Sequence, residues 1–90
     1  MTERSLQITF RKGRAFAAYL HLAHPPGARS VRTEASADGL FVVDYGADGR
    51  PIGIEITAPE AVNRERLNAV LESLGEPPLP ELEFRPLTAA

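Results

Sequence analysis

The chain has 90 residues, of which 43% are hydrophobic and 24% charged, and its formal net charge is −2. A chain of this length predicts a single domain with a small core, and the ordinary apolar fraction excludes wholesale disorder. The slightly acidic balance argues against constitutive nucleic-acid binding, and the absence of cysteine excludes disulfides, thiolate metal sites and a cysteine nucleophile.

Targeting and membrane signals are missing from the sequence. The N-terminal residues are polar, and no apolar run of signal-peptide length follows them. No window approaches the roughly 20 apolar residues that a membrane helix needs. We therefore expect a cytoplasmic protein that makes no contact with a membrane.

Two alternating segments near the N-terminus predict a β-hairpin. Leu6, Ile8 and Phe10 alternate with polar residues, which is typical of a half-buried strand. Residues 15–22 alternate again, with Phe16, Ala18, Leu20 and Leu22 expected on one face and Ala15, Ala17, Tyr19 and His21 on the other. The basic, glycine-containing residues 11–14 between the two segments suit a turn.

A second hairpin is predicted further along the chain. Pro25-Pro26 ends the preceding strand, and the polar residues 29–36 can form either an edge strand or a loop. Residues 40–45 and 51–57 form the clearest pair of strands. The Asp48-Gly49 turn between them supplies the positive φ that tight hairpins need.

A helix is predicted after the strands. Gly75 followed by Pro77-Pro78 would end it, and its start has two alternatives: a capping box at residues 57–60, or a cap by Asn63. Its apolar stripe has the spacing of one helix face and consists of Leu67, Val70, Leu71 and Leu74.

This order of elements predicts the α+β class. We expect an antiparallel β-sheet of about four to five strands, followed by one C-terminal amphipathic helix packed on one face. Residues 1–76 would form the single domain. Residues 77–90 would form a proline-rich tail, either docked on the domain or free to bind a partner.

One helix cannot cover both faces of such a sheet. The second face, bearing Phe41, Val43 and Tyr45, or else Tyr19 and Ala17, would then need another cover. Either the tail or a second copy of the chain could supply it, and a two-fold homodimer is the commonest closure. The candidate interface residues in the tail are Leu82, Phe84 and Leu87.

The second hairpin also carries a recognisable motif. Residues 40–56 read LFVVDYGADGRPIGIEI, and this stretch resembles the domain of unknown function 2283 family of small bacterial proteins. That family has a strand ending near Asp-Tyr, a turn with Asp-Gly, and Gly-Ile-Glu-Ile in the returning strand. The matching positions are Asp44, Tyr45, Asp48, Gly49, Gly53, Ile54, Glu55 and Ile56.

The resemblance extends more weakly over residues 6–22. Tyr19-Leu20-His21-Leu22 matches a strand of the family, but the basic residues 11–14 stand where the family has an acidic turn. The resemblance implies no assigned activity. Some members are similar to partners of small toxin-like proteins, so it implies an antitoxin-like interaction at most.

Few residues suggest chemistry. Asp44, Asp48 and Glu55 could form a carboxylate cluster, although a turn residue flanked by solvent-facing acids is the simpler interpretation. His21 and His24 would point to opposite faces of a strand, so we expect no metal site and no cofactor.

The basic residues of the first turn suggest a charge-based contact. Arg11, Lys12 and Arg14, with Arg29 and Arg32 as further candidates, could bind phosphate or an acidic partner, although solvated turn residues are the default. DNA binding through this turn is a third hypothesis, which the net charge disfavours.

The sequence thus predicts a non-enzymatic interaction module. We expect a homodimer that binds a small, toxin-like protein partner. The alternative is a small-ligand or metal-binding protein that uses Asp44, Glu55 and His21 at the strand ends.

Overall fold

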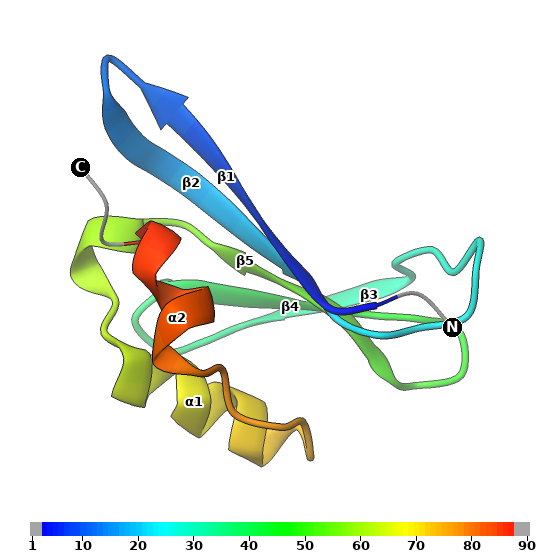
Figure 1. The fold of residues 1–90 in the computed structure, drawn as a ribbon. Coiled ribbons are helices and arrows are strands. Elements are labelled where there is room, and N and C mark those ends of the chain that lie inside the picture. The colour runs from blue at the N-terminus through cyan, green and yellow to red at the C-terminus, as the bar shows by residue number, and fades with distance from the viewer. Residues whose placement is uncertain (1–2, 88–90) are drawn as a thin grey trace.

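A computed structural model describes residues 3–87. The strands form one antiparallel sheet in the order β1-β2-β5-β4-β3, so the fold belongs to the α+β class. The elements, drawn in Figure 1, are β1 (Ser5–Arg11), β2 (Arg14–His21), β3 (Arg32–Ala35), β4 (Phe41–Tyr45), β5 (Pro51–Ile56), the 3-10 helix η1 (Pro59–Ala61), α1 (Arg64–Ser73), α2 (Glu81–Phe84) and the 3-10 helix η2 (Arg85–Leu87).

Both predicted hairpins are present. β1 pairs with β2, and β4 pairs with β5 across a turn in which Gly49 has a φ of +83°. The open question about residues 29–36 is answered by β3, a short strand at the edge of the sheet beside β4. β5 lies at the centre, because it also pairs with β2.

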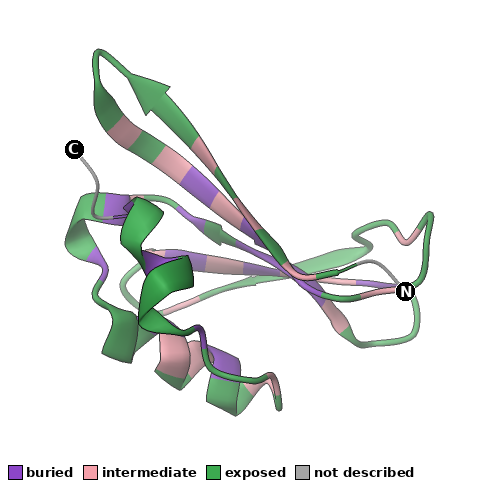
Figure 2. Ribbon diagram, viewed as in Figure 1, coloured by how far each residue is buried: buried purple, intermediate pink, exposed green. Residues whose placement is uncertain are grey.

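The core lies between one face of the sheet and the helical segments (Figures 1 and 2). The alternation in each strand sends every second side chain to that face, which explains the periodic burial. Its buried members are Ala18, Leu20, Leu22, Phe41, Val43, Ile54, Ile56, Val62, Leu67, Leu71, Leu79, Phe84 and Leu87.

The prediction of a single C-terminal helix is wrong. The chain after β5 forms two α-helices and two 3-10 segments, because prolines interrupt it repeatedly. α1 begins with Asn63 as its cap, whose side chain accepts a hydrogen bond from the Arg66 amide at 2.8 Å. The capping box at residues 57–60 does not form, since the Thr57 hydroxyl donates to the Gly39 carbonyl instead.

The end of α1 agrees with the sequence. Gly75 has a φ of +73°, and its amide donates to the carbonyl of Glu72. The Glu76 amide reaches back to the carbonyl of Leu71. This is the Schellman arrangement, in which glycine adopts the left-handed conformation without steric cost.

The described part of the tail packs on the domain. Leu79, Phe84 and Leu87 are buried in the core, and Asn68 holds the backbone of Leu79 through both its amide and its carbonyl. Residues 88–90 of the predicted tail lie outside the described residues.

The second face of the sheet is polar, which contradicts the expected apolar face. Phe41 and Val43 belong to the core face, because each lies opposite a buried isoleucine of β5. The other face carries Tyr19 and Ala17, as the alternative prediction had it, together with Val42 and the polar residues Gln7, His21, Asp44 and Glu55. An uncovered apolar face therefore gives no reason for a dimer.

No helix within residues 3–87 is long and apolar enough to cross a membrane.

Candidate functional site

The β1–β2 hairpin contains a β-bulge close to its tip. Thr9 pairs with Ala17 but Phe10 pairs with Ala15, so Phe16 is an extra residue without a partner in β1. The sequence alternation placed Phe16 on one face with Ala18, Leu20 and Leu22; these three residues are buried, whereas Phe16 is 51% exposed. Phe16 is therefore a bulge residue with an exposed ring near the end of the hairpin.

The turn at the tip is tight. Lys12 has a φ of +53° and Gly13 a φ of +77°, the left-handed pair that a two-residue hairpin loop requires. Arg11 and Arg14 flank this loop as the last pair of the ladder. The fold thus presents three cationic side chains within four consecutive residues at the end of a projecting hairpin (Figure 1).

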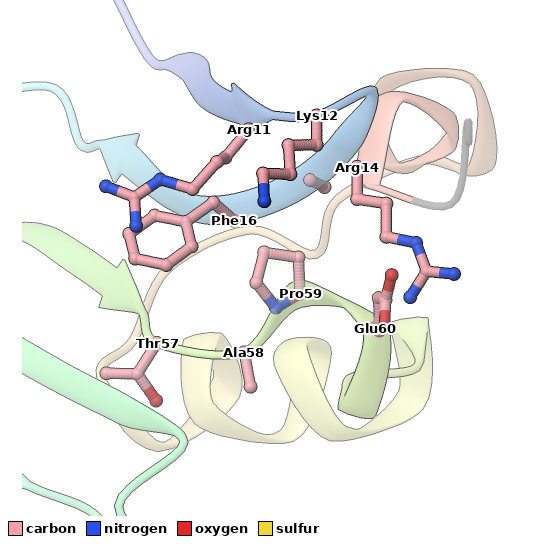
Figure 3. Close-up of a pocket in the computed structure, with 9 residues that line it drawn as sticks. Arg11, Lys12, Arg14, Phe16, Thr57, Ala58, Pro59 and Glu60 are labelled. Carbon is pink, nitrogen blue, oxygen red and sulfur yellow. The ribbon is translucent and has the colours of Figure 1, made fainter.

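A groove of about 500 Å³ separates this hairpin tip from the segment that follows β5. Figure 3 shows the three cations and the Phe16 ring on the hairpin side, with Ala58, Pro59 and Glu60 across from them. We call this the basic groove, lined by Arg11, Lys12, Arg14, Ala15, Phe16, Thr57, Ala58, Pro59 and Glu60.

The charge of the basic groove is unbalanced. Glu60 is its one acid against three cations. The ion pairs formed within residues 3–87 are Arg32–Glu34, Arg50–Asp48 and Arg66–Asp38, and none of them includes a groove cation. The Arg11 guanidinium lies 4.4 Å from the centre of the Phe16 ring, so a cation–π contact orients it. A groove with several cations and an aromatic ring is suited to a ligand whose carboxylates belong to an apolar or extended segment.

The open face of the sheet holds a second group of polar residues. The Tyr19 hydroxyl donates to Asp44 Oδ2 at 2.6 Å, and the Ser30 hydroxyl reaches Asp44 Oδ1 at 3.2 Å. His21 Nε2 lies 3.1 Å from Gln7 Oε1, and its ring lies 4.6 Å from that of Tyr19. These side chains satisfy one another across the strands, which is typical of a structural network.

The Tyr19 hydroxyl is held in its neutral form. Burial, followed by the hydrogen bond to the Asp44 carboxylate, raises the pKa of Tyr19 far above its usual range. Both carboxylate oxygens of Asp44 already accept hydrogen bonds. Tyr19 is therefore a poor proton donor or nucleophile at neutral pH.

Gly53 makes this network sterically feasible. A Cβ atom at Gly53 would lie 2.1 Å from the Tyr19 hydroxyl oxygen and 2.3 Å from its Cε1. A glycine in a strand leaves room for an aromatic ring to lie over the backbone. The ring belongs to Tyr19, because β2, not only β4, is a neighbour of β5.

The motif residues of the second hairpin do not converge on one site. Tyr45 packs under the Arg32 guanidinium at 4.1 Å, and Asp48 accepts a hydrogen bond from the Arg50 amide within the turn. Glu55 is exposed on the open face. Ile54 and Ile56 are fully buried.

No metal centre is formed by the described residues. Within residues 3–87, no three His, Asp or Glu side chains are placed to hold an ion. His24 lies apart from His21, in a hollow of about 410 Å³ at the far end of the sheet that Val31 and Ile52 also line.

Of the three candidate interface residues in the tail, only Leu82 is accessible, with 72% of its surface exposed. Phe84 and Leu87 are buried in the core of their own chain. The sequence could not tell the exposed residue from the two buried ones, because the spacing of apolar residues in a short irregular segment does not reveal which side chains face the domain.

The chain matches no protein-family model, no curated protein and no solved structure.

Proposed function

We propose that this protein is a non-enzymatic interaction module that binds an acidic segment of a protein partner in the basic groove. One observation carries the proposal: three cations without ion-pair partners in residues 3–87 line one groove together with an exposed aromatic ring, on a hairpin that projects from the domain.

Charge complementarity selects the partner. A net charge of −2 disfavours a long polyanion such as DNA, because the rest of the chain repels it. A short acidic segment meets only the local excess of positive charge. The exposed Phe16 ring adds apolar surface that a peptide side chain can contact.

The family resemblance narrows the proposal. An antitoxin-like module would neutralise a small toxin-like protein by direct contact, and membership in the 2283 family, through the Asp44-Tyr45 to Ile56 motif, is part of this proposal. Because the basic groove carries three cations, we further propose that the segment of the partner that contacts it is acidic.

The test measures fluorescence anisotropy of a labelled oligoglutamate peptide titrated with the protein. We expect saturable binding that weakens with added salt, because exposed ion pairs are screened. The variant Arg11→Ala/Lys12→Ala/Arg14→Ala should weaken binding roughly tenfold or more, as the loss of about three exposed charge contacts predicts.

A matched control removes the same charge elsewhere. Arg29→Ala/Arg50→Ala/Arg64→Ala takes three cations from outside the basic groove and should bind the peptide nearly as the wild type does. Equal losses in the two triple variants would contradict the proposal, since they would reveal only a net-charge effect. Tighter binding of single-stranded oligothymidylate than of oligoglutamate would replace the protein partner with nucleic acid.

A further inference from the structure

The two edges of the sheet differ in how they are protected. β3 is four residues long, and Arg32 and Glu34 form an ion pair on it at 3.1 Å. Short, charged strands of this kind discourage pairing with another chain. β1 is seven residues long and contains no proline, and its first six residues, Ser5 to Phe10, carry no charge.

The backbone of β1 has a partner on one side only. Within residues 3–87 it pairs with β2 alone, and no other described segment adds to its outer edge (Figure 1). The bulge lies in β2, so β1 itself remains regular from Ser5 to Arg11. A long, regular, uncharged edge is a template for strand addition.

We infer that the strand added to this edge is β1 of a second copy of the chain. An antiparallel pair centred on Ile8 places each Ile8 opposite its copy and Leu6 opposite Phe10. Gln7 then lies opposite Thr9 on the other face. Apolar residues thus meet apolar residues and polar residues meet polar ones in a single register.

This register also covers an exposed ring. Phe10 is 52% exposed in the single chain, and Leu6 of the partner copy lies beside it in the paired sheet. A pair centred on one residue is compatible with both the hydrogen-bonded and the non-hydrogen-bonded spacing of antiparallel strands. The contact is isologous and closes as a two-fold dimer, leaving β3 as the outer edge of each half.

This dimer does not involve the basic groove. The reason for it is the open outer edge of β1, and not an uncovered apolar face of the sheet. Its test exploits the direct opposition of Gln7 and Thr9, both exposed. Gln7→Lys/Thr9→Lys places lysine opposite lysine across the two-fold axis. Gln7→Glu/Thr9→Glu does the same with glutamate, and a mixture of the two variants places lysine opposite glutamate.

The measurement is the association state by sedimentation equilibrium and native mass spectrometry, with circular dichroism to verify folding. We expect a wild-type dimer, and roughly tenfold weaker self-association of each charged variant from about two like-charge pairs. The equimolar mixture should recover a heterodimer of intermediate mass. The control Thr33→Lys/Ala35→Lys alters the β3 edge and should leave the dimer unchanged.

Three results would overturn the inference. The first is a wild-type chain that stays monomeric at every concentration reached. The second is a folded lysine variant that dimerises as tightly as the wild type. The third is loss of the dimer in the β3 control, which would place the interface at the opposite edge of the sheet.

Discussion

The substitution Gly53→Ala tests the packing of the open face. Gly53 does not adopt a positive φ, so alanine is allowed by the backbone and the effect must come from contact with Tyr19. The new methyl group would lie 2.1 Å from the Tyr19 hydroxyl oxygen, so the ring has to move away from Asp44.

The expected decrease in the free energy of unfolding has two contributions. A hydrogen bond to a carboxylate contributes about 1.5–3 kcal/mol, and overpacking costs about 1–3 kcal/mol. Because the Tyr19 ring is only half-buried and can swing toward solvent, we take the lower end of the combined range, about 2.5–3 kcal/mol. For a domain of this size that lowers Tm by roughly 10–20 °C.

The assay is urea and thermal unfolding followed by far-ultraviolet circular dichroism. In the Tyr19→Ala background the steric conflict is gone, so Gly53→Ala should be neutral or stabilise by about 0.5–1 kcal/mol. A destabilisation of equal size with and without the Tyr19 ring would refute the reasoning, as would a Gly53→Ala chain as stable as the wild type.

Three further predictions concern stability. Because the pKa of Tyr19 is raised in the folded state, its contribution is complete below the ordinary tyrosine pKa of about 10 and is lost as pH rises above it; Tyr19→Phe should therefore show a smaller alkaline loss of stability in pH-dependent urea titrations. Leu87→Ala should destabilise by about 2–4 kcal/mol, whereas Leu82→Ala should stay within about 0.5 kcal/mol, and equal effects in urea unfolding would contradict the docked position of residues 79–87. Asn63→Ala should cost about 1 kcal/mol by loss of the α1 cap, and an unchanged unfolding midpoint would argue against that cap.

The sequence predicted the structural elements that depend on residues close together in the chain. Alternation indicated both hairpins, since the side chains of a strand with one buried face repeat every two residues. Gly75 marked the end of α1 for a similarly local reason, because the residue after the helix adopts a left-handed conformation that glycine adopts most easily.

Features that depend on distant segments were missed. The sequence does not reveal that β2 lies beside β5, and this neighbour relation places Tyr19 over Gly53 and beside Asp44. The register of β4 against β5 places Phe41 and Val43 on the core face, so the second face lacks the apolar residues that were expected there.

The basic groove was only partly foreseen. The cluster Arg11, Lys12 and Arg14 was visible in the sequence, but its default interpretation was a solvated turn. Phe16 is the extra residue of a bulge, and one inserted residue leaves no signature in an alternating pattern. The opposite wall of the groove comes from residues 57–60, more than 40 residues further along the chain.

The central claim is that recognition takes place at the hairpin tip and not on the open face of the sheet. The most direct measurement is a nuclear magnetic resonance titration of the isotope-labelled chain with oligoglutamate. The account predicts that backbone amide signals of residues 10–16 and of Thr57, Ala58 and Glu60 shift together, while those of Tyr19, Asp44 and Gly53 stay in place. Shifts confined to the open face, or no shift at any residue, would contradict it.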